Sequence, residues 1–163
     1  MWSYRRMKRL FPLKPLVKKN PVEDRHLLRV PQYTGTPGTL YLTHSEDGDP
    51  LMIFADNKES LTVLHCVLDE RLFSDTVFRV VRLNPHRYIV YDLRYLNGVD
   101  FHSSHTYVER SQRIRDILEE FHHPDLVALE TPEQIPSWEF PIRGYECYDE
   151  HPGSMGVFLP VNE

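Results

Sequence analysis

Residues 88–98 read YIVYDLRYLNG, and this stretch decides the fold that the sequence predicts. Ile, Val and Tyr are favoured in strands, and Asn-Gly is favoured in the tight turns that end them. Soon after, Thr106 and Glu109 have the spacing of a capping box, which marks the start of a helix. The stretch therefore predicts a strand over Arg87–Leu93, a turn, and then a helix over residues 106–121.

The predicted helix has one apolar face and a clear end. Its apolar residues recur at helical spacing, and they are Tyr107, Ile114, Ile117, Leu118 and Phe121. Pro124 prevents the helix from continuing much further.

Working outward, the segments on both sides of this stretch have the composition of short strands. These segments are Thr39–His44, Pro50–Ala55, Leu61–Leu68, Thr76–Arg82, Trp138–Tyr148 and Gly156–Pro160. Residues 45–49 (SEDGD) form a predicted turn, in which Gly48 can adopt a positive φ. The last two strands are expected to form a closing hairpin around Pro152-Gly153. The predicted class is α+β: mainly an antiparallel meander packed with one helix, residues 106–121.

Length and composition predict one domain with a tail. A chain of 163 residues that is 40% hydrophobic is globular and can bury one core. Residues 1–38 are predicted to be a basic tail with a proline-rich lead-in, and residues 39–163 to be a single α+β domain. No apolar run is long enough to span a membrane.

Charge is unevenly distributed along the chain. Residues 1–20 contain seven basic residues and no acidic ones, which leaves 12 of the 19 basic residues against all 24 acidic residues, a net charge of −12, in the remainder. The basic residues are candidates for contacts with RNA phosphates, and they are Arg5, Arg6, Lys8, Arg9, Lys14, Lys18 and Lys19. A solvated arm and an organellar targeting segment are the alternatives for this tail.

Only two cysteines occur, Cys66 and Cys147, and no CxxC spacing is present, so neither a disulfide framework nor a zinc ribbon is expected. This composition favours a reducing, intracellular location in the cytoplasm or nucleus, or in the mitochondrion if the tail is a targeting segment. No histidine pair has carboxylates or cysteines at a ligand spacing, so we expect no metal site and no cofactor.

Together, these segments resemble the nucleotidyltransferase fold of mRNA capping enzymes and polynucleotide ligases. They also resemble the cap-binding domain of snurportin, a non-catalytic relative. The resemblance covers residues 39–160 and is best at Tyr88–Leu93, Asn97-Gly98 and Tyr107-Val108-Glu109-Arg110. Leu68-Asp69-Glu70 and Pro141–Glu146 are looser matches, because the former lacks a glycine and the latter has Arg143 where an acid is expected.

The catalytic motif of that family is not complete here. Its Lys-x-Asp-Gly sequence corresponds to Ser45-Glu46-Asp47-Gly48, so serine stands in the position of the nucleophilic lysine. The family needs that amine to hold the nucleotide as a phosphoramidate. No lysine follows Lys58, and Lys58 itself lacks a following Asp-Gly. We therefore expect no catalytic residues and no enzymatic activity.

The resemblance implies a ligand site made of Tyr91, Asp92, Arg110, Trp138 and Arg143. In this view the two rings stack on a base, Asp92 accepts from a base edge or ribose, and the arginines contact phosphate. Each of these residues also has a structural explanation without a ligand. Tyr91 can be a half-buried strand residue, Trp138 can close the core, and Arg110 can belong to a surface ion network on the helix.

Two functions follow as the main hypotheses, ahead of an active enzyme that would use Lys58 as its nucleophile. In the first, a non-catalytic module binds a nucleotide, an RNA 5′ end or an RNA-associated partner. In the second, the chain is a protein-interaction subunit of a larger ribonucleoprotein assembly with no small-molecule ligand. An open, arginine-lined cleft beside Tyr91 would favour the first hypothesis, and a cleft filled by side chains would favour the second.

Overall fold

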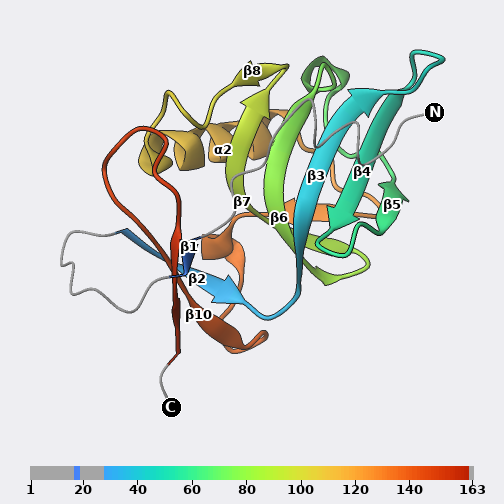
Figure 1. The fold of residues 1–163 in the computed structure, drawn as a ribbon. Helices are drawn as coiled ribbons and strands as arrows, with labels where there is room; N and C mark the ends of the chain where they lie inside the picture. The colour runs from blue at the N-terminus through green and yellow to red at the C-terminus, as the bar shows by residue number, and fades with distance from the viewer. Residues whose placement is uncertain (1–16, 19–27, 162–163) are drawn as a thin grey trace.

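The computed structural model describes residues 17–18 and 28–161, which form an α+β fold of two sheets and one long helix (Figure 1). The predicted class, mainly antiparallel with one helix, is confirmed. The nucleotidyltransferase-like topology stays a proposal.

The large sheet is mainly antiparallel. In sheet order its strands are β5 (Leu61–Leu64), β4 (Pro50–Asp56), β3 (Thr36–His44), β6 (Thr76–Asn84), β7 (Arg87–Leu96) and β8 (Val99–Asp100). Its central pair, β3 and β6, joins strands that are not consecutive in the chain. In addition, β9 (Ala128–Glu130) pairs parallel to β7. A short 3-10 helix, η1 (Glu70–Leu72), lies between β5 and β6.

The small sheet brings distant segments of the chain together. Its order is β1 (Val17–Lys18), β11 (Val157–Pro160), β10 (Ile142–Tyr148) and β2 (Leu28–Tyr33). The predicted closing hairpin is confirmed, because β10 and β11 are antiparallel. A second 3-10 helix, η2 (Pro132–Gln134), precedes β10.

Several predicted boundaries differ in the structure. The predicted strand Trp138–Tyr148 begins only at Ile142, because residues 137–139 form a turn. The predicted strand Leu61–Leu68 ends at Leu64, and Leu68 makes an isolated bridge to His122. Within the predicted lead-in, β2 pairs with β10 and then leads directly into β3, which ties the two sheets together (Figure 1). Pro31 is tolerated in β2 because that strand lies at a sheet edge.

The helix and the first turn follow their sequence signals. Helix α2 (Tyr107–Phe121) begins with the predicted capping box, in which the Thr106 hydroxyl accepts from the Glu109 amide and the Glu109 side chain accepts from the Thr106 amide. At the β3–β4 turn, Gly48 has a φ of 85°, and the Ser45 amide donates to the Asp49 carbonyl at 2.8 Å.

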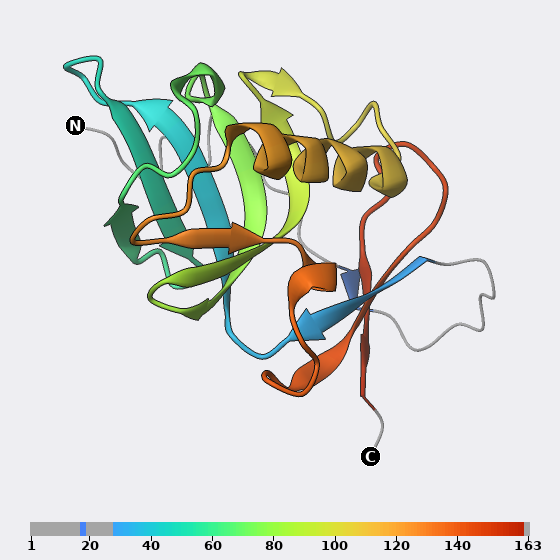
Figure 2. The same ribbon diagram turned by 180° about the vertical axis from the view of Figure 1, so that it is seen from behind.

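The two faces of the large sheet bury different clusters. Helix α2 covers one face, where Ile114 and Ile117 pack with Phe78 and Val90 (Figure 2). On the opposite face, Tyr91 packs in a second cluster that includes three tyrosines from other elements: Tyr33, Tyr107 and Tyr148. This second cluster lies where the small sheet meets the large one. Among the described residues, no helix is long and apolar enough to span a membrane.

Candidate functional site: a polar cluster between the sheets

A β-bulge in β7 places two of the predicted ligand residues on the same face. Along the β6–β7 ladder, Arg79 pairs with Asp92 but the next residue, Val80, pairs with Val90, so Tyr91 is the extra residue. A bulge of this kind sets two residues of one strand opposite one residue of its partner. Tyr91 and Asp92 therefore both lie opposite Arg79, although strict alternation would send them to opposite faces.

Asp92 and Arg110 form a buried ion pair. Arg110 Nε donates to Asp92 Oδ1 at 2.7 Å, and Nη2 donates to Oδ2 at 3.3 Å. Both side chains are almost fully excluded from solvent, at 0% exposure for Arg110 and 1% for Asp92. Asp92 also accepts from the Leu93 amide at 2.8 Å and lies 3.9 Å from Arg94 Nη1.

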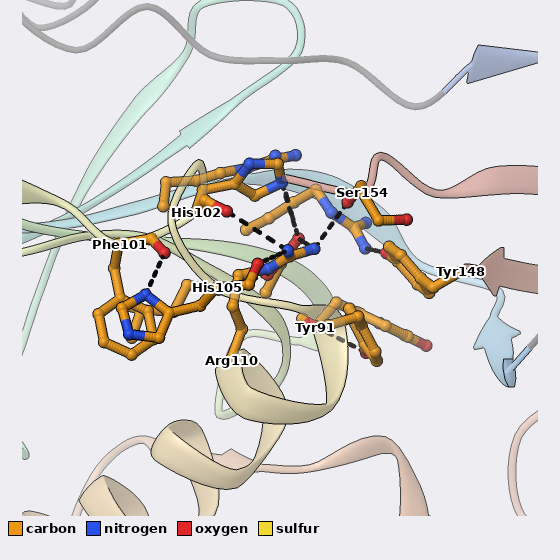
Figure 3. Close-up of polar contacts among 12 residues, drawn as sticks. Tyr91, Phe101, His102, His105, Arg110, Tyr148 and Ser154 are labelled. Carbon is orange, nitrogen blue, oxygen red and sulfur yellow. Dashed lines mark hydrogen bonds and ion pairs between the residues drawn. The ribbon is translucent and has the colours of Figure 1, made fainter. Parts of the chain in front are cut away.

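The remaining Arg110 donors are used by main-chain carbonyls. Nη1 donates to the carbonyl of His105 at 2.8 Å and more weakly to that of His102 at 3.5 Å, and Nη2 donates to the carbonyl of Ser154 at 2.7 Å (Figure 3). A guanidinium has five N–H groups, and these contacts engage all of them. Arg110 thus ties β7, the loop before α2 and the loop between β10 and β11 together, and it has no donor left for a phosphate.

A second buried ion pair joins the two sheets. Arg79 in β6 donates through both Nη atoms to the carboxylate of Glu146 in β10, and Nη2 also donates to the Tyr148 hydroxyl at 3.0 Å. Gln32 in β2 donates to Glu146 at 2.7 Å. Burial lowers the pKa of Arg79, but Glu146, Tyr148 and Asp92 together raise it by more, so the pKa lies well above its ordinary value.

Tyr91 is held inside this cluster. Its side chain is 1% exposed, and its hydroxyl donates to the Pro31 carbonyl at 2.9 Å and accepts from the Tyr33 amide at 3.1 Å. The guanidinium of Arg79 lies over the ring, 5.2 Å from its centroid. Burial raises the pKa of the Tyr91 phenol. These contacts occupy the position in which a stacked base was predicted.

A stacked tyrosine pair closes the cluster from the helix side. The rings of Tyr107 and Tyr148 lie 3.6 Å apart between centroids with an interplanar angle of 11°, and the Tyr107 hydroxyl donates to the Tyr91 carbonyl at 2.9 Å. Burial raises the pKa of both phenols well above the ordinary value. We call Arg79, Tyr91, Asp92, Arg110, Glu146 and Tyr148 the inter-sheet polar cluster.

The other two predicted ligand residues lie outside this cluster. Trp138, in the turn between η2 and β10, is 85% exposed. Arg143 is exposed on β10, where its guanidinium lies 5.0 Å from the centroid of the Phe158 ring. The structure thus brings together Tyr91, Asp92 and Arg110 but not Trp138 or Arg143, and the ligand role of all five stays a prediction.

The Ser45 turn is also distant from Tyr91. Ser45 follows the end of β3, six residues beyond Thr39, which pairs with Arg79. At the rise of a strand, this separation is about 20 Å along the sheet. The structure therefore does not bring the serine in the lysine position next to Tyr91. Lys58 lies in the exposed turn between β4 and β5.

Most of the predicted RNA contacts fall outside the described residues. Lys18 lies in β1, whereas Arg5, Arg6, Lys8, Arg9, Lys14 and Lys19 are not described by the structure. Over residues 17–18 and 28–161, no group of three or more His, Cys, Asp or Glu side chains is arranged to hold a metal ion.

The cluster contains residues that sequence reasoning did not assign to the site, above all Glu146 and Tyr148. A signal for them exists in the sequence: Arg79 lies within the apolar strand TVFRVV, and Glu146 lies within GYECY. Opposite charges in the middle of two apolar strands are buried only when they are paired. That pattern suggests that the two strands face each other.

A separate groove of about 840 Å³ lies between the second half of α2 and the end of β7. The apolar residues Leu96 and Ile117 and the charged residues Arg113, Asp116 and Glu120 are among those that line it. It does not include any residue of the inter-sheet polar cluster.

The chain matches no protein-family model, and no curated protein is significantly similar to it in sequence.

Proposed function

We propose that the chain is a non-catalytic protein-interaction module of a larger assembly, and that it acts through its outer surface without a small-molecule ligand. This is the second of the two hypotheses that the sequence raised.

The filled interior around Tyr91 is the observation that carries this proposal. The Arg79 guanidinium lies over the Tyr91 ring. The Tyr91 hydroxyl makes two hydrogen bonds to the main chain of β2, one as donor and one as acceptor. A nucleotide that stacked on Tyr91 would have to displace the Arg79–Glu146 pair, which joins the two sheets. Separating a buried ion pair is costly because each charge is left without its partner in a region of low dielectric.

Nucleotidyl transfer needs a nucleophile, and the residue that the resemblance places in that position is Ser45. Ser45 forms part of a turn, where its hydroxyl accepts from the Asp49 amide at 3.2 Å. No general base among the described contacts activates that hydroxyl, and a serine without a base is a poor nucleophile. This supports the non-catalytic part of the proposal.

The outer surface has two features that suit recognition of a partner protein: an exposed tryptophan and a negative net charge. Trp138 is the most exposed of the large hydrophobic residues in the described part of the chain. Tryptophan is enriched among the residues that dominate binding energy at protein interfaces. The net charge of −12 beyond residue 20 would steer a basic partner toward the domain. Contact of the basic tail with RNA in such an assembly is a further part of the proposal.

A ligand titration tests the absence of a small-molecule site. We expect no heat of binding by calorimetry when GTP or a methylated cap analogue is added at about millimolar concentration, which would place any dissociation constant above that range. Binding that is lost in Tyr91→Ala, in a variant shown by circular dichroism to be folded, would overturn the proposal. A covalent label from radioactive GTP that disappears in Lys58→Ala would also overturn it.

A purification experiment tests the partner. Affinity purification of the tagged chain, with and without ribonuclease, should yield the same stoichiometric protein partner, which is then reconstituted from purified components. Trp138→Ala should weaken the reconstituted complex about tenfold or more, as expected at a binding hot spot. Val108→Ala, a matched change at another exposed apolar residue, should not weaken it. A complex that ribonuclease abolishes would favour the RNA-binding hypothesis instead.

A further inference from the structure

Within residues 17–18 and 28–161, no strand pairs with the outer edge of β5 in the large sheet. Strand β5 is the terminal strand in the sheet order, and it lies at one side of the molecule, next to β4 (Figure 1). Leu61 is 42% exposed and Val63 is 67% exposed. The four residues Leu61–Leu64 include no proline and no charged residue, although these are the usual means of protecting an edge from pairing.

The turn before β5 fixes the direction of its main-chain groups. The Asp56 amide donates to the Ser60 carbonyl at 3.1 Å, which makes these two residues a hydrogen-bonded pair. Such pairs alternate along an antiparallel ladder, so Thr62 and Leu64 bond to β4, whereas the N–H and C=O groups of Leu61 and Val63 point away from it. The open edge therefore presents two donors and two acceptors.

We propose that β5 pairs with β5 of a second copy of this chain, antiparallel and about a two-fold axis at Thr62. In this register, Leu61 lies opposite Val63 of the second copy and Val63 lies opposite its Leu61. The two pairs complete four main-chain hydrogen bonds and cover apolar side chains with apolar side chains. An interface of this kind is isologous, as in most closed dimers.

Charge complementarity at the ends of β5 argues for a second copy over another strand. The same register places the turn with Lys58 and Glu59 beside His65 of the second copy. His65 Nε2 lies 3.2 Å from Asp125 Oδ2, so this end carries an exposed carboxylate next to an imidazole. Lys58, the one lysine beyond residue 20, therefore lies on the side of the exposed Asp125 carboxylate of the second copy, which has the opposite charge. The two-fold axis forms this contact twice.

Disulfide cross-linking tests the register. Across the axis, Thr62 would face Thr62 of the second copy as a non-hydrogen-bonded pair with a Cα–Cα distance of about 4.5 Å, which a disulfide can bridge. In a Cys66→Ser background, Thr62→Cys should give a covalent dimer on mild oxidation. The matched variant Val63→Cys should cross-link far less, because its two copies are diagonal neighbours roughly 7–8 Å apart. Equal cross-linking of both variants, or none of either, would overturn the register.

Sedimentation equilibrium tests the association itself. The wild-type chain should form dimers as its concentration rises. Val63→Pro should raise the dissociation constant about tenfold or more, since it removes an outward N–H in each copy but no bond to β4. Val108→Lys, a change on α2, should leave the dissociation constant unchanged. A wild-type chain that stays monomeric up to about millimolar concentration, or a dimer that Val63→Pro does not weaken, refutes the pairing. Neither result would bear on the proposed function, which has its own ligand and partner tests.

Discussion

Replacing Arg110 by methionine should destabilise the protein strongly, because it leaves a buried carboxylate without its main partner. After the change, Asp92 keeps the Leu93 amide at 2.8 Å and Arg94 at 3.9 Å, but it loses both bonds from the guanidinium. Removing one member of a buried ion pair typically costs about 3–5 kcal/mol. The carbonyls of His105 and Ser154 lose their donors as well. We therefore expect the free energy of unfolding to fall by about 4 kcal/mol.

Urea unfolding monitored by circular dichroism measures this loss, and Arg113→Met is the matched control. Arg113 lies one turn further along α2 and is exposed, so its replacement should change the free energy of unfolding by less than about 0.5 kcal/mol. Arg110→Lys should be intermediate, since it keeps a positive charge but loses the two-pronged geometry.

A double-mutant cycle separates the ion pair from the carbonyl contacts. Combining Arg110→Met with Asp92→Leu should recover about 2 kcal/mol relative to Arg110→Met alone, because the unpaired charge is gone. Equal losses for Arg110→Met and Arg113→Met, or no recovery in the double variant, would refute the reasoning that the cluster holds the two sheets together.

Three further predictions concern other parts of the fold. Burial, followed by the charge of His123, lowers the pKa of His122 below 6.5, and its Nε2 accepts from the Leu129 amide at 3.2 Å. The contribution of neutral His122 to the free energy of unfolding is therefore fully present above about pH 6.5, and it is lost as the pH drops toward the folded-state pKa. Urea unfolding at several pH values should show a weaker pH dependence for His122→Gln than for the wild-type chain. Gly38→Ala would place a Cβ 2.3 Å from the Ala55 carbonyl oxygen, which should cost about 1–3 kcal/mol in thermal unfolding, and an unchanged melting temperature would contradict this packing. Trp138→Ala should alter the free energy of unfolding by less than about 0.5 kcal/mol, and a larger loss would mean that the ring packs against the domain.

Local sequence signals were sufficient for the helix and most of the strands. The capping box at Thr106 and Glu109 marks the first turn of α2 to the residue, because both of its hydrogen bonds form within four residues. The Asp-Gly turn after β3 is equally local. The prediction for β5 ran four residues too long, to Leu68, because an apolar segment does not reveal where its pairing partner ends.

The candidate site depended on contacts that no local pattern contains. Alternation along β7 predicts opposite faces for Tyr91 and Asp92, and the bulge that unites them is visible only in the pairing with β6. Likewise, Glu146 reaches Arg79 across 67 residues of sequence.

From the sequence alone came the α+β class, the helix with its cap, the turn glycine and the absence of any lysine after Lys58. Each of these depends on residue type and short-range spacing, which act before any long-range contact forms. Only the tertiary structure determined that the small sheet joins β2 to β10, that the space beside Tyr91 is filled, and that Trp138 lies in solvent. These features arise because buried charges must find partners, and the partners come from strands that are distant in the chain but adjacent in the fold.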